Sequence, residues 1–149
     1  MLKALRNLFN GSRDGAAVAG HERKHLQLAV ASLLHESARV DQGEHPGEQA
    51  AARQALAELF DLDAEACAAL LEEGRARALQ TTSYFGAVSV IKRDFTQAQR
   101  VSFIEHLWRI ACADGSLDPY EDHYVRKIAH LLYVPNTQCM LARGRARPA

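Results

Sequence analysis

The chain has 149 residues, 18 of them basic and 18 acidic, and nearly half of its residues are apolar. This length and apolar content fit one compact domain with its own core and leave little room for a second domain. The balanced charge, without a long run of one sign, argues against a general nucleic-acid-binding surface.

Three cysteines, Cys67, Cys112 and Cys139, are odd in number and widely spaced. Without a Cys-x-x-Cys pair they favour reduced thiols over a disulfide framework or a zinc ribbon. No apolar run approaches the roughly 20 residues that span a bilayer, and the N-terminus lacks the apolar stretch of a signal peptide. We therefore expect a cytoplasmic protein.

Helical periodicity dominates the chain, because Gly and Pro are few and almost no stretch alternates apolar and polar residues. We expect an all-α, single-domain bundle of about seven helices. Residues 1–20 form a short amphipathic helix and a linker in this reading. The apolar side of that helix, Leu2 to Phe9, either packs on its own domain or makes a peripheral membrane contact.

The main domain, residues 21–135, begins with helices predicted over about 21–40, 46–60 and 64–80, with Asp63 as the N-cap of the third. A short helix or turn is expected before Phe95. Thr96 and Gln99 then form a capping box that opens the next helix.

The last strong apolar pattern starts near Pro119 and runs to Val134, where Pro135 is expected to end the helix. Residues 136–149 follow as a basic tail with Arg143, Arg145 and Arg147. We expect this tail to be a loose end.

Two helix-loop-helix segments of the chain repeat each other. "ESARVDQGEHPGEQAAARQALAELFDL" aligns with "RIACADGSLDPYEDHYVRKIAHLLYV", with one extra residue in the first, and pairs Ala38 with Ala111 and Leu62 with Val134. The acidic residues of the two loops and the prolines also match in pairs: Asp41 with Asp114, Pro46 with Pro119, and Glu48 with Glu121. The repeat predicts a pseudo-symmetric bundle.

The second loop, "ADGSLDPYE", mixes two kinds of signal. Asp118, Pro119 and Glu121 fit the N-cap, N1 and N3 positions of a helix start, and Gly115 fits the stop of the preceding helix. Asp114 is different, since an acid in a last helical turn faces the negative end of the dipole and needs a donor or a cation.

An EF-hand is excluded, because Pro119 stands where its glycine is required and Val125 where its bidentate glutamate is required. A looser oxygen site for Ca²⁺, Mg²⁺, Mn²⁺ or Zn²⁺ remains a hypothesis beside plain helix capping. Such a cation site requires that the pseudo-twofold axis relating the two repeats brings their loops together. Its candidate ligands are Asp41, Glu48, Asp114, Asp118 and Glu121.

These loops resemble the tellurite-resistance TerB-like family, an all-helical domain with two units of the form Asp-x6-Glu. The resemblance is carried by "LLHESARVD" with Glu48 and by "LWRIACADGSLDPYEDHYVRKIAHLL", and it covers most of residues 21–135. It implies a bacterial domain linked to stress or tellurite response, acidic residues that are candidates for metal binding, and a protein partner. The first loop departs from the pattern, with Gln42 in place of Gly115. No enzymatic activity is implied.

One competing pattern is "HERKH", in which His21, Glu22 and His25 match the H-E-x-x-H signature of zinc hydrolases and Glu44 follows as an imaginable third ligand. Two cations, Arg23 and Lys24, occupy its inner positions. The short match lies at the polar start of a helix, which favours a solvated surface. We therefore expect no enzyme, and an interaction or sensing module instead.

Overall fold

The computed structural model describes residues 16–38, 46–80, 84–113, 115 and 117–147, with the side chains of 16–19 left out. Seven helices and no strand are found in these residues, so the all-α prediction is confirmed. In chain order, the helices are α2 (Ala16–Ser37), α3 (Pro46–Phe60), α4 (Ala64–Gln80), α5 (Phe85–Asp94), α6 (Gln97–Ala111), α7 (Pro119–Leu131) and α8 (Asn136–Ala146).

Local capping chemistry explains where several helices begin. Asp63 accepts a hydrogen bond from the amide of Ala66 at 2.8 Å before α4. Thr96 and Gln99 form the predicted capping box of α6, with the Gln99 side chain accepting from the Thr96 amide at 2.7 Å. The bounds predicted for α3 and α4 are also confirmed.

The first helix is longer at its start than predicted. It begins at Ala16, so residues 16–20 are helical and the linker expectation is wrong for them. Their sequence, AAVAG, is rich in alanine, which has the highest helix propensity. The predicted amphipathic helix over Leu2 to Phe9 lies outside the described residues.

Helix α7 ends before Pro135, at Leu131, and a backbone motif ends it. Tyr133 has a left-handed φ of 59°, and the amide of Val134 donates to the carbonyl of Ala129 at 2.9 Å. Together with the bond from the Tyr133 amide to His130, this is a Schellman cap. Pro135 instead precedes α8 as its N-cap.

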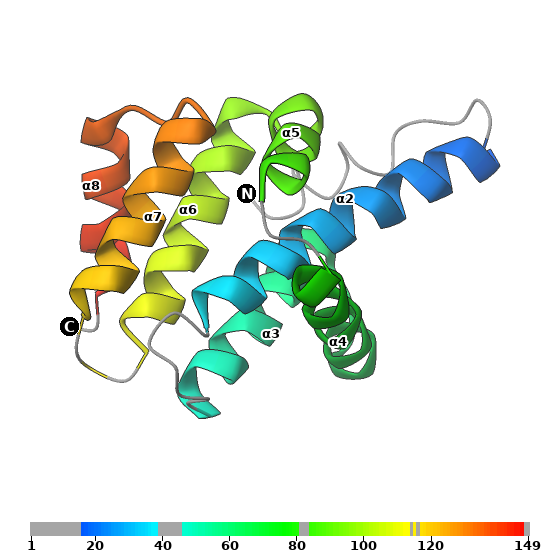
Figure 1. Ribbon diagram of the computed structural model, residues 1–149, viewed down its shortest axis with the longest axis horizontal. Coiled ribbons are helices and arrows are strands. Elements are labelled where there is room, and N and C mark those ends of the chain that lie inside the picture. Colours follow the sequence, from blue (N-terminus) through cyan, green and yellow to red (C-terminus); the bar gives the residue numbers. More distant parts are fainter. Residues whose placement is uncertain (1–15, 39–45, 81–83, 114, 116, 148–149) are drawn as a thin grey trace.

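The predicted loose tail over residues 136–149 is wrong for residues 136–146, which form α8. This helix buries Cys139 and Ala142 against α6, and the indole of Trp108 donates a hydrogen bond to the carbonyl of Cys139 at 3.1 Å. Figure 1 shows α8 beside α6 and α7. The few apolar side chains of α8 are enough to complete the core around Trp108.

The repeat extends to a third helix in each half. Helix α4 packs along α2 and α8 along α6, and these are the two most extensive helix contacts. The same register pairs Asp61 with Tyr133, the two non-glycine residues of positive φ among those described. It also pairs the buried cysteines Cys67 and Cys139. Burial raises the pKa of both thiols, as suits packing side chains.

The two halves share one core. Helix α3 packs on α6, and the hydroxyl of Tyr124 in α7 donates to the carbonyl of Leu33 in α2 at 3.0 Å. The largest fully buried side chains come from both halves: Leu33, Leu34, Leu56, Phe60, Phe103, Ile104, Leu107, Trp108, Ile110, Ile128 and Leu132, with Ile91 of α5. No helix of the described residues is long and apolar enough to cross a membrane.

Candidate functional site

The two acidic helix starts lie at the same end of the bundle. The C-terminal ends of α2 and α6 and the starts of α3 and α7 all face the lower side of Figure 1. A Cβ added to Gly47, at the start of α3, would lie 3.4 Å from the carbonyl oxygen of Ala113, just past the end of α6. The residues next in sequence are Glu48 and Asp114, so the first acidic helix begins beside the second loop.

Both predicted glutamate ligands are buried. Glu48 is fully buried and Glu121 is 2% exposed, each at the third position of its helix. The positive end of a helix dipole favours a carboxylate at this place. A capping glutamate usually stays in contact with water, and fully buried glutamates are rare unless they are engaged. Both take part in interactions within the folded chain.

Asp118 has the predicted local role. Its carboxylate accepts a hydrogen bond from the amide of Tyr120 at 2.7 Å, with Pro119 at the first helical position. Gly115 has a φ of +88°, the left-handed conformation expected after the preceding helix. Helix capping therefore explains Asp118, and the left-handed backbone after α6 explains Gly115.

Asp41 and Asp114 lie outside the described residues. Among the residues that are described, no group of three or more His, Cys, Asp or Glu side chains could hold a metal ion. The convergence of all the predicted ligands therefore stays a prediction.

The HERKH segment lies in the second and third turns of α2 and does not gather ligands within the described chain. His21 and Glu22 are exposed, and Lys24 pairs with Glu73 of α4 at 3.2 Å. His25 instead lines a cleft between α2, α4 and α5. Glu44, the imagined third ligand, is outside the described residues.

One charged cluster was not predicted as a unit. His106 of α6 is 4% exposed, and its Nε2 lies 3.3 Å from the carboxylate of Glu58 in α3. Arg109 bridges Glu58 and Glu105, and Glu105 also pairs with Arg145 of α8. Only the (i, i+4) pair of Glu105 and Arg109 has a signal in the sequence, because the other partners come from different helices. The cluster links α3, α6 and α8.

The fold therefore defines a class of protein: an all-helical bundle of two three-helix repeats with an acidic start at the second helix of each. A family model described as "Tellurite resistance protein TerB" matches residues 27–144, and the chain belongs to this family. The match includes most of α8, in agreement with its place in the core. Membership of this family supports the view that the chain is a tellurite-resistance-related module. No curated protein and no solved structure matches the chain.

Proposed function

We propose that the protein is a non-enzymatic interaction or sensing module in a bacterial tellurite-resistance or stress response, and that a divalent cation binds between its two acidic loops. The observation that carries the proposal is the burial of Glu48 and Glu121 at equivalent positions of the two repeats. Family membership supports the first part.

Physical chemistry favours a cation at this end of the bundle. Burying a carboxylate is costly, and a helix dipole offsets only part of the cost. Gly47, at the start of α3, lies so close to Ala113, the residue before Asp114, that an added Cβ would be 3.4 Å from the Ala113 carbonyl oxygen. A set of carboxylate oxygens suits Ca²⁺, Mg²⁺ or Mn²⁺ better than Zn²⁺, which prefers nitrogen and sulfur.

Calorimetric titration with each of the four chlorides tests the cation. We expect at least one of the ions Ca²⁺, Mg²⁺, Mn²⁺ and Zn²⁺ to bind the wild type. Glu121→Gln and Asp114→Ala should each weaken its affinity at least tenfold, because each removes one carboxylate charge from the site. Asp63→Asn is the matched control: it removes one acid at a distant helix start, and Asn caps as well as Asp. A wild type that binds none of the four ions, or variants that bind like the wild type, would refute the cation.

A further inference from the structure

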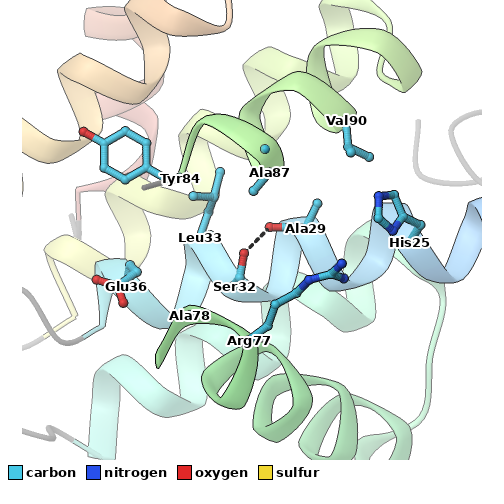
Figure 2. A pocket seen from close by; sticks show the side chains of 11 residues that line it. His25, Ala29, Ser32, Leu33, Glu36, Arg77, Ala78, Tyr84, Ala87 and Val90 are labelled. Carbon is cyan, nitrogen blue, oxygen red and sulfur yellow. Dashed lines mark hydrogen bonds between the residues drawn. The ribbon is translucent and has the colours of Figure 1, made fainter. Parts of the chain in front are cut away.

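A cleft of about 380 Å³ opens between α2, α4 and α5, away from the acidic loops. Figure 2 shows its walls: Ala29 and Leu33 from α2, and Ala87 and Val90 from α5. The volume lies in the range of small-molecule sites, which are mostly apolar with a few placed polar groups.

Two basic side chains, His25 of α2 and Arg77 of α4, line this cleft. Figure 2 shows the Arg77 guanidinium extending toward the part of α2 that carries Ala29 and His25. Within the described chain neither side chain makes an ion pair, whereas their neighbours do: Lys24 pairs with Glu73, and Arg75 with Glu72 at 2.6 Å. The carboxylates of Glu72 and Glu73 are therefore paired with other cations, and no ion-pair partner for Arg77 or His25 is found among the described residues.

The two ends of the cleft differ in charge. Its acidic lining residue, Glu36, lies 11 residues after His25 on α2, about 16 Å along the axis at 1.5 Å per residue. Figure 2 shows Glu36 and His25 at opposite ends. A negative group is favoured near Arg77 and disfavoured near Glu36. The geometry fits a ligand with one anionic head and an uncharged body.

We propose that this cleft is a binding site for a small amphipathic organic anion, whose head pairs with Arg77 and His25 and whose apolar body lies against Leu33, Ala87 and Val90. The guanidinium fork of Arg77 suits a carboxylate or another oxyanion. The site shares no residue with the acidic loops, so it stands or falls independently of the cation.

Two fluorescent probes test the proposal: 8-anilinonaphthalene-1-sulfonate, which carries an anionic head, and N-phenyl-1-naphthylamine, the same ring system without it. We expect the sulfonate to bind the folded protein at one site. Arg77→Gln should weaken the sulfonate at least tenfold and change the affinity for the neutral probe by less than twofold. Ala87→Phe, which fills the apolar wall, should weaken both.

Arg147→Gln makes the same change of net charge on an exposed residue beyond α8 and should leave both affinities unchanged. Thermal midpoints of every variant check that the fold is retained. Three results would each overturn the proposal: no effect of Arg77→Gln on the sulfonate, an equal effect of Arg147→Gln, or binding that appears only after residues 1–15 are removed. The last would assign the cleft to the chain's own N-terminus.

Discussion

His106 illustrates how burial changes one side chain. Burial lowers its pKa to about 4, the Glu58 carboxylate opposes this shift, and the Arg109 cation adds to it. In the sequence His106 is one of seven scattered histidines. Its position between helices makes it a neutral residue of the folded state at pH 7.

Because the pKa of His106 is lower in the folded chain than its ordinary value of 6.5, the unfolded chain takes up the proton first as the pH falls. The contribution of His106 to the free energy of unfolding is therefore complete above pH 6.5 and is lost toward pH 4. We expect a loss of about 2 kcal/mol between pH 7 and pH 5 from this residue. Urea unfolding at a series of pH values measures it.

His106→Gln should flatten this part of the profile, since glutamine does not titrate. His130→Gln, at an exposed position of α7, should leave the slope as it is in the wild type. A profile that His106→Gln does not change would contradict the assignment.

Asp118 and Glu121, both at the start of α7, differ in how far the sequence explains them. Capping explains Asp118 and was sufficient, from the sequence, for Glu121 as well. The burial of Glu121, and of Glu48 in the other repeat, is a feature that no local pattern indicates. Whether a neighbouring helix covers a side chain is decided by packing.

At the scale of elements, α2 and α4 approach each other closely at Gly74. A Cβ added there would lie 2.7 Å from the carbonyl carbon of Ala31 and 2.9 Å from the amide nitrogen of Ser32. Both contacts are to backbone, which cannot rotate aside as a side chain can. Gly74 therefore sets how tightly the third helix of the first repeat packs.

Gly74→Ala should destabilise the protein by about 1–3 kcal/mol, because the helices must separate or strain. This outweighs the gain of up to about 1 kcal/mol that alanine gives in a helix interior. Gly144→Ala in α8, where nothing lies within 4 Å of the added Cβ, should show that gain alone. We expect the two variants to shift the urea midpoint in opposite directions from the wild type. A Gly74→Ala variant as stable as the wild type would show that α2 and α4 are not held at this distance.

At the scale of the whole molecule, α8 packs on the first helix of the second repeat, α6, as α4 packs on the first helix of the first repeat, α2. Trp108, the single tryptophan of the chain, is fully buried, and its indole bonds to the backbone of α8. Arg143 of α8 also lies over the indole ring, 5.8 Å from its centroid. Loss of α8 would expose this side of the core.

A chain that ends at Pro135 should therefore unfold at a much lower temperature and show red-shifted tryptophan emission in buffer. A chain that lacks only Pro148 and Ala149 should match the 149-residue chain in both. Blue-shifted emission and an unchanged midpoint after removal of α8 would mean that the core is complete without it.

The sequence by itself determined the helical class, the bounds of α3 and α4, and the caps at Asp63, Thr96 and Asp118. These depend on side chains close together in the chain, whose periodicity and capping bonds are local. Only the tertiary structure decided that α8 belongs to the core, that Glu48 and Glu121 are buried, and that His25 and Arg77 face one cleft. Each of these depends on which helices meet, and that is set by packing between residues far apart in the chain.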